Sequence, residues 1–166
     1  MIGEARRRLS GPGARAERML RAMREQDVEA VRGSYEALNR KDIEGTVAVL
    51  APDAEWHESS ELPDSDVFIG REAVRRFLQG FLEQWSEFRQ EVEEVTVEGE
   101  RAAVFIHLTA RGRGSGANVD ARYAHLWTVR GGLGVRVDAY YDRDAALRAL
   151  TSPCIPAARI ETQKTT

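Results

Sequence analysis

Apolar residues recur at helical spacing in the first half of the chain and at alternate positions in the second half. The clearest helical stripe follows Gly70, and its members are Val74, Phe77, Leu78, Phe81, Leu82 and Trp85. Steps of three and four residues place such side chains on one face of a helix. The pattern predicts an amphipathic helix after Gly70, with its apolar face in the core.

Two weaker helical patterns come earlier. Asp27 is a candidate N-cap for a helix whose apolar positions are Val28, Val31, Tyr35 and Leu38. Asp42 is a candidate N-cap for a second, short helix that carries Ile43, Val47 and Leu50 and ends before Pro52. We expect a short strand over residues 54–58 and a polar loop over residues 59–69.

The period changes to two after Trp85, which is typical of half-buried strands. We expect strands at 88–98, 101–111, 119–130 and 134–141. Turns at Gly99–Glu100 and Gly131–Gly132 would join the outer pairs. A last helix is expected from Asp142 to Leu150.

Helices grouped before a run of antiparallel strands favour the α+β class, with the first three helices on one face of a curved sheet. The twist of long strands makes that face concave. A concave apolar face covered by amphipathic helices is suited to a small-molecule pocket.

Composition and charge exclude several classes of protein function. The net charge of -3 argues against a general nucleic-acid binder. No apolar run reaches the roughly 18 residues that a membrane span needs. The N-terminus lacks the apolar stretch of an export signal, and Cys154 stands alone. We therefore expect a cytoplasmic protein.

The chain divides into three parts. Residues 1–24 carry seven arginines around Gly11–Gly13 and are expected to form a basic, disordered arm, or to precede the true start at Met19 or Met23. Residues 25–150 form the folded domain, and residues 151–166 are a flexible tail. We find neither a dinucleotide fingerprint nor a convincing set of metal ligands, so no cofactor is expected.

Several segments carry a resemblance to a known family. Residues 35–42, residues 47–58 and the start of the helix at 70–74 resemble SnoaL-like and ketosteroid isomerase-like proteins of the nuclear transport factor 2-like superfamily. Residues 124–129 and 140–147 are similar to a bacterial subgroup with no assigned function. The resemblance covers residues 25–150 and implies a cone-shaped fold with a small-molecule pocket. It does not imply one reaction, because the superfamily includes isomerases, hydrolases, dehydratases, cyclases and non-catalytic proteins.

Glu58 is the first candidate for a catalytic residue. Strand alternation places Trp56 and Glu58 on one face and His57 on the other. The resemblance implies that Glu58 matches the general base of the ketosteroid isomerases, with Trp56 shaping the substrate pocket. Desolvation would raise the pKa of such a carboxyl group. The alternative is a glutamate in water or paired with Arg71.

Other positions depart from the known enzymes. The oxyanion-binding tyrosine of the isomerases aligns with Ser34, next to Tyr35, and their second acid aligns with Leu126. The water-activating tyrosine and asparagine of limonene epoxide hydrolases align with Trp56 and Glu58, and one of their aspartates aligns with Ala139. Neither mechanism is therefore expected.

Ser34, Tyr35, Leu126 and Ala139 remain candidate substrate-binding residues. Arg111 could bind a substrate carboxylate at the pocket mouth. The alternative is a solvated strand end.

A second candidate site lies on the strands after residue 100. A hairpin symmetric about Gly116 would set His107 opposite His125, and the Gly131–Gly132 turn would set Asp138 opposite His125. One sheet face would then present His107, Tyr123, His125, Trp127, Asp138 and Tyr140. The resemblance to the superfamily implies that the smaller apolar face lines the pocket, with Ile106, Leu108, Ala124, Leu126, Val137 and Ala139.

The first face has two interpretations. His125 and Asp138 could form an acid–base dyad, or the face could be an aromatic homodimer interface, which we favour. A metal site is not expected, because three neighbouring strand positions rarely converge on one ion.

The sequence thus predicts a pocket for a small apolar molecule, with proton-transfer chemistry of the isomerase, cyclase or hydrolase type. The alternative is a non-catalytic ligand-binding or dimeric interaction domain.

Overall fold

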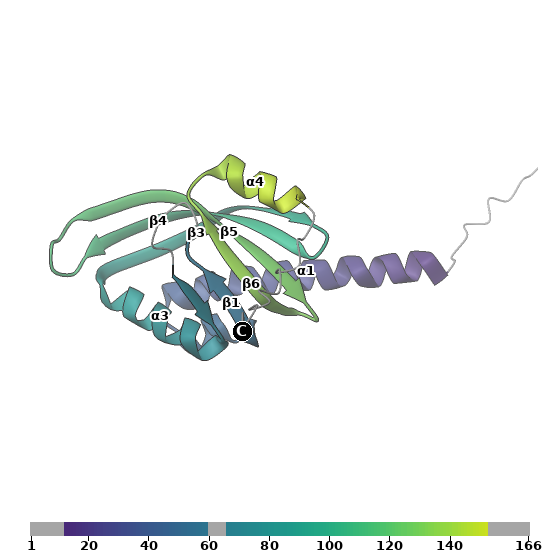
Figure 1. Ribbon diagram of the computed structural model, residues 1–166, viewed down its shortest axis with the longest axis horizontal. Coiled ribbons are helices and arrows are strands. Elements are labelled where there is room, and N and C mark those ends of the chain that lie inside the picture. The colour runs from purple at the N-terminus through teal and green to yellow at the C-terminus, as the bar shows by residue number, and fades with distance from the viewer. Residues whose placement is uncertain (1–11, 60–65, 153–166) are drawn as a thin grey trace, which may run out of the picture.

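A computed structural model describes residues 12–59 and 66–152 and shows an α+β fold (Figure 1). Its elements follow in the order α1 (Pro12–Asn39), α2 (Ile43–Val47), β1 (Leu50–His57), β2 (Val67–Ile69), α3 (Arg71–Glu83), β3 (Trp85–Glu98), β4 (Arg101–Gly112), β5 (Asn118–Arg130), β6 (Leu133–Tyr140) and α4 (Arg143–Thr151). The predicted fold class is confirmed.

The strands form one curved sheet in the order β2-β1-β6-β5-β4-β3. Neighbouring strands run antiparallel except β1 and β6, which run parallel. The sheet is therefore mixed, where the sequence predicted an antiparallel one. Gly99, Gly131 and Gly132 take positive φ angles at the two predicted tight turns, a conformation that suits glycine.

Helices cover both faces of the sheet (Figure 1). The helices α1 to α3 contribute buried residues such as Tyr35, Val47 and Leu78 to a core that also includes Trp56 and Trp127 from the strands. The helix α4 packs on the opposite face, against a second cluster of Ala103, Phe105, Ala124 and Leu126. The first cluster surrounds the cavity described below.

Several predicted boundaries are wrong. Asp27 lies inside α1, which begins at Pro12, so Asp27 is no N-cap. The side chain of Asp42 does cap α2, accepting a hydrogen bond from the Gly45 N–H. However, α2 ends at Val47, and Pro52 lies within β1. The expected loop contains β2, while residues 60–65 lie outside the described residues. Of the predicted arm over residues 1–24, residues 1–11 lie outside the described residues and residues 12–24 belong to α1. Of the predicted tail over residues 151–166, the part from residue 153 lies outside the described residues.

The register of β5 differs from the predicted one at both edges. Arg111 pairs with Asn118, so the β4–β5 hairpin is centred between Gly114 and Ser115, and His107 faces Arg122. This odd offset turns the other face of β5 toward the helices. On the second edge Arg130 pairs with Leu133 as predicted, but a bulge after Thr128 sets His125 opposite Ala139.

The result of both shifts is an exchange of faces on β5. Tyr123, His125 and Trp127 line the inside, whereas Ala124 and Leu126 lie under α4. The predicted aromatic outer face is therefore wrong for β5. Asp138 sits opposite Leu126, and the predicted pairing with His125 does not form.

Candidate functional site

A cavity of about 330 Å³ lies between the helices and the inner face of the sheet. Most of its lining is apolar or aromatic, and the residues are Ser34, Tyr35, Leu38, Thr46, Leu50, Trp56, Glu58, Phe77, Leu78, Phe81, Trp85, Gln90, Leu108, Val119, Ala121, Tyr123, His125, Trp127, Ala139, Tyr140 and Tyr141. The volume is within the usual range for small-molecule sites. The arrangement can enclose a small organic molecule and present a few polar groups to it.

Glu58 follows the end of β1 and lies at the wall of this cavity. The indole Nε1–H of Trp56 donates a hydrogen bond of 2.7 Å to its Oε1. Partial burial raises the pKa of the Glu58 carboxyl group, which the Trp56 hydrogen bond lowers in part and the charge of Asp66 raises further. A carboxylate with a raised pKa in an apolar site can act as a general base near neutral pH.

A buried hydrogen-bonded cluster in the cavity wall joins Tyr35 of α1 to His125 and Trp127 of β5. The Trp127 Nε1–H donates to the Tyr35 hydroxyl oxygen at 2.9 Å, and that oxygen lies 2.8 Å from Nδ1 of His125. All three side chains are at least 95% buried. Burial lowers the pKa of His125 to about 3, so its imidazole is neutral at physiological pH.

Aromatic contacts tie Glu58 to this buried group. The ring of Trp56, whose N–H binds Glu58, meets the His125 ring edge to face with centroids 5.0 Å apart. Tyr123 meets His125 in the same way at 5.1 Å. Burial raises the pKa of Tyr123, so its hydroxyl stays protonated, and it accepts a hydrogen bond from the Gln90 amide.

Other residues predicted to bind substrate separate into two groups. Ser34 and Ala139 line the cavity, although the Ser34 hydroxyl already donates to the Val31 carbonyl at 2.7 Å. Leu126 packs under α4 on the opposite sheet face, so its predicted place in the pocket is wrong. Arg111 is exposed at the end of β4 and is not part of the cavity lining.

The predicted His125–Asp138 dyad is also wrong. The Asp138 carboxylate binds Arg136 at 2.7 Å on the outer face, while His125 points inward. The bulge after Thr128 is the physical reason, since it shifts β6 by one residue and so turns Asp138 away.

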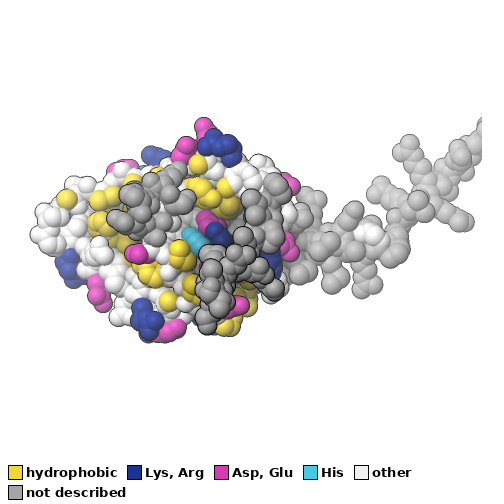
Figure 2. Space-filling view, in the orientation of Figure 1, with side chains coloured by type: hydrophobic (Ala, Val, Ile, Leu, Met, Phe, Trp, Pro, Cys, Tyr) yellow, Lys and Arg dark blue, Asp and Glu magenta, His cyan; other side chains and the backbone are white. Residues whose placement is uncertain are grey.

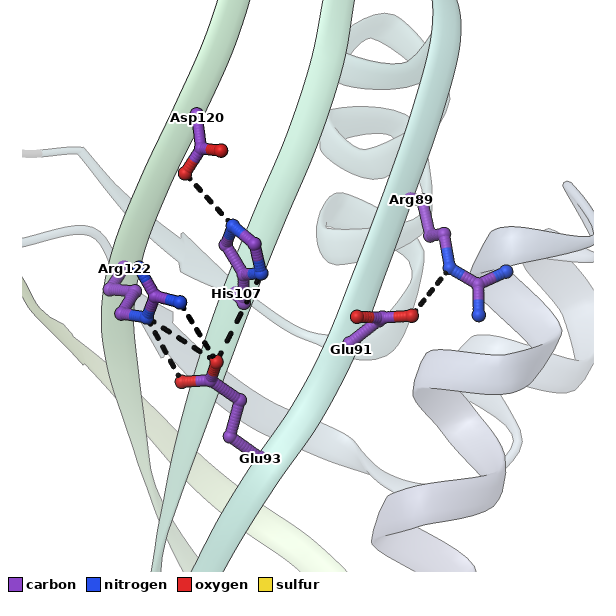
Figure 3. Close-up of polar contacts among 6 residues, drawn as sticks. All are labelled: Arg89, Glu91, Glu93, His107, Asp120 and Arg122. Carbon is purple, nitrogen blue, oxygen red and sulfur yellow. Dashed lines mark hydrogen bonds and ion pairs between the residues drawn. The ribbon is translucent and has the colours of Figure 1, made fainter.

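His107 belongs to a charged network on the outer face of the sheet (Figure 3). Its Nε2 lies 2.8 Å from Asp120, its Nδ1 lies 4.0 Å from Glu93, and Glu93 also pairs with Arg122. The carboxylates face exposed cations rather than a cavity. This network is a solvated sheet surface.

Sequence reasoning missed part of the cavity lining. Tyr123 and Trp127 lie inside, contrary to the prediction, because the β4–β5 hairpin is centred between Gly114 and Ser115 and not on Gly116. Phe77, Phe81 and Trp85 belong to the stripe predicted to lie in the core, and the structure shows that they also line the cavity. The signal in the sequence is their aromatic character, because small-molecule cavities are lined mainly by apolar and aromatic side chains.

Metal-binding clusters, membrane-spanning helices and charged patches are the other features of the described structure that would indicate a function. Within residues 12–59 and 66–152, no three His, Cys, Asp or Glu side chains gather closely enough to hold a metal ion. The helices in the described parts of the chain are too short or too polar to cross a membrane. Figure 2 shows acidic and basic side chains scattered over one face, without a broad area of one charge.

Comparison with known proteins agrees with the fold. Residues 31–137 match the family model of the SnoaL-like domain. A comparison with curated protein sequences returns no match. A nuclear transport factor 2-like protein of unknown function from Burkholderia pseudomallei K96243 is 25% identical with a TM-score of 0.63, over 76% of this chain and 98% of that chain.

Two further solved structures contain organic ligands. TerC, crystallised with polyporic acid, is 24% identical with a TM-score of 0.62, over 75% of this chain and 97% of that chain. A Mycobacterium tuberculosis protein in complex with estradiol-17beta-hemisuccinate is 22% identical with a TM-score of 0.60, over 72% of this chain and 95% of that chain. At this level of sequence identity, both comparisons show similarity of fold alone.

Proposed function

The chain belongs to the SnoaL-like domain family, and from this premise we propose that it is a cofactor-independent acid–base enzyme. Glu58 removes or returns a proton on a small, mostly apolar organic molecule in the cavity. The observation that carries the proposal is the Glu58 carboxyl group, held by the Trp56 indole at the wall of an aromatic hollow.

The environment of Glu58 supports this role. Its Oε1 accepts the Trp56 hydrogen bond, and the structure records no partner for Oε2 among the described residues. Burial raises its pKa toward the working range of a general base. Proteins of the same fold that hold polyporic acid and estradiol-17beta-hemisuccinate support a small organic ligand.

A general probe of a buried base tests the proposal. Glu58 would remove the C3 proton of 5-nitrobenzisoxazole, the N–O bond would break, and a coloured cyanophenolate would form. Glu58→Gln keeps the shape and removes the base, so we expect the rate to fall about 10²-fold or more. Glu55→Gln is the matched control, because Glu55 lies in β1, three residues before Glu58, and pairs with His57 on the outer face.

The pH profile adds an independent readout. The wild-type rate should rise with pH and level off above the raised pKa of Glu58, because only the ionised carboxylate accepts the proton. A Glu58→Gln variant as fast as wild type would remove the catalytic assignment. The alternative function, a non-catalytic ligand-binding domain, would then be favoured by the apolar lining of the cavity.

The expected homodimer through the sheet stays a prediction. The aromatic side chains on which it was based lie inside the cavity, and α4 covers the apolar part of the outer face. Sedimentation velocity measures the oligomeric state directly.

A further inference from the structure

One edge of the His125 ring is available to a ligand. Nδ1 is turned toward the Tyr35 hydroxyl at 2.8 Å, and the structure records no partner for Nε2 among the described residues. His125 is 5% exposed and lines the cavity. Nε2 is therefore the ring atom that a bound molecule can reach.

Hydrogen-bond chemistry fixes which nitrogen carries the proton. An indole N–H can only donate, so the Tyr35 oxygen accepts from Trp127 at 2.9 Å. The hydroxyl proton of Tyr35 is then free to bind His125 Nδ1, which must be the unprotonated nitrogen. The other tautomer would leave this buried hydroxyl proton without an acceptor, which is unfavourable in a buried site. The imidazole proton therefore lies on Nε2.

The Nε2–H group and Glu58 adjoin the same side chain. Trp56 donates its N–H to Glu58 at 2.7 Å, and its ring contacts His125 with centroids 5.0 Å apart. Burial keeps the imidazole neutral, since it lowers the pKa of His125 to about 3. A neutral donor and the base thus both contact Trp56 and both line the same largely apolar cavity.

We propose that His125 is the polar recognition group of the cavity and that its Nε2–H binds an acceptor oxygen, such as a carbonyl, of a small apolar ligand. Tyr35 is a positioning residue that sets the tautomer. The inference rests on the proposed function only for its consequence in catalysis: an oxygen that gains charge when Glu58 takes a proton would be stabilised by this donor.

Nitrogen NMR of the intact protein tests the tautomer. The His125 imidazole signals are assigned as those missing from the spectrum of the His125→Phe variant. We expect this imidazole to be neutral and protonated at Nε2 between about pH 5 and 8. Tyr35→Phe should move the population toward the Nδ1–H tautomer. A wild-type His125 that is protonated at Nδ1, or charged, would overturn the proposal, as would a tautomer unaffected by Tyr35→Phe.

Ligand pairs test the recognition. 2-Tetralone and tetralin differ mainly by one carbonyl oxygen, and each fits a cavity of about 330 Å³. Calorimetry should show that wild type binds 2-tetralone about three- to tenfold more tightly than tetralin. This ratio corresponds to the net contribution of one hydrogen bond. The bound ketone should also show a lower C=O stretching frequency than in His125→Phe, which should lose the preference.

Two variants separate the possible failures. His107→Phe changes a histidine on the outer sheet face and should keep the ketone preference. Glu55→Gln should also keep it, because Glu55 pairs with His57 on the outer face and is not part of the cavity lining. Equal binding of both ligands to wild type, or binding of neither, would overturn the recognition role whatever the outcome of the proton-transfer assay.

Discussion

Trp56 organises the polar chemistry of the cavity at the scale of single residues. Its N–H fixes one oxygen of Glu58, and its ring fixes the position of His125. Tyr35 plays a similar part deeper in the cavity, because its hydroxyl joins His125 to Trp127. The Trp127 N–H, the Tyr35 hydroxyl and His125 Nδ1 satisfy one another, which lets these buried polar atoms persist in an apolar site.

Tyr35→Phe removes one oxygen and leaves the shape almost unchanged. The Trp127 N–H then loses its acceptor in a buried site, so we expect the free energy of unfolding to fall by about 1–3 kcal/mol. Urea unfolding measures this change. An unchanged midpoint would mean that the hydroxyl does not stabilise the fold.

The lowered pKa of His125 makes stability depend on pH. The unfolded chain takes up a proton near pH 6.5, but the folded chain does so only near 3, so acid favours unfolding. The contribution of the neutral His125 side chain to the free energy of unfolding is fully present above about pH 6.5 and is lost as the pH falls toward 3. It amounts to several kcal/mol at most, at about 1.4 kcal/mol for each unit of pKa.

Unfolding curves of wild type and His125→Phe between pH 7 and 4 measure the difference. We expect the wild type to lose stability more steeply with acid than the His125→Phe variant does. Parallel slopes for wild type and His125→Phe would contradict the neutral, buried imidazole.

Strand register decides which chemistry reaches the cavity at the scale of elements. Alternation along β1 correctly predicted Trp56 inside and His57 outside. Successive side chains of a regular strand point to opposite faces of the sheet, so this prediction needs no information about neighbouring strands. The turn at Gly131–Gly132 was also predictable from its residues. The centre of the β4–β5 hairpin and the bulge after Thr128 were not, because their energies come from contacts far apart in sequence.

Gly134 of β6 lies close to the ring of Trp127. A Cβ added there would lie 2.8 Å from the Trp127 ring, and this ring is buried. We expect Gly134→Ala to destabilise the protein by about 1–3 kcal/mol through overpacking. Gly80→Ala is the control, since Gly80 is exposed in α3 with open space around it.

The control should change stability in the opposite direction. Alanine is favoured over glycine inside a helix by about 0.5–1 kcal/mol, so Gly80→Ala should raise the thermal midpoint. Calorimetry of the two variants gives both values. Equal effects of the two substitutions would contradict the close packing of β6 on Trp127.

A hollow between two layers defines the molecule at the largest scale. The helices α1 to α3 and the inner sheet face leave a cavity of about 330 Å³, while α4 covers part of the outer face. The fold class and the site of Glu58 were accessible from the sequence and its family resemblance. The exchange of faces on β5, which brings His125, Tyr123 and Trp127 inside, required the three-dimensional register.

The most direct measurement is the titration of the Glu58 side-chain carboxyl carbon by NMR, with and without tetralin. The pKa of Glu58 should lie above its ordinary value of 4.5 in the free protein, because of burial. It should rise further when tetralin displaces water from the cavity. An ordinary pKa that tetralin does not move would contradict a Glu58 base inside an accessible apolar hollow.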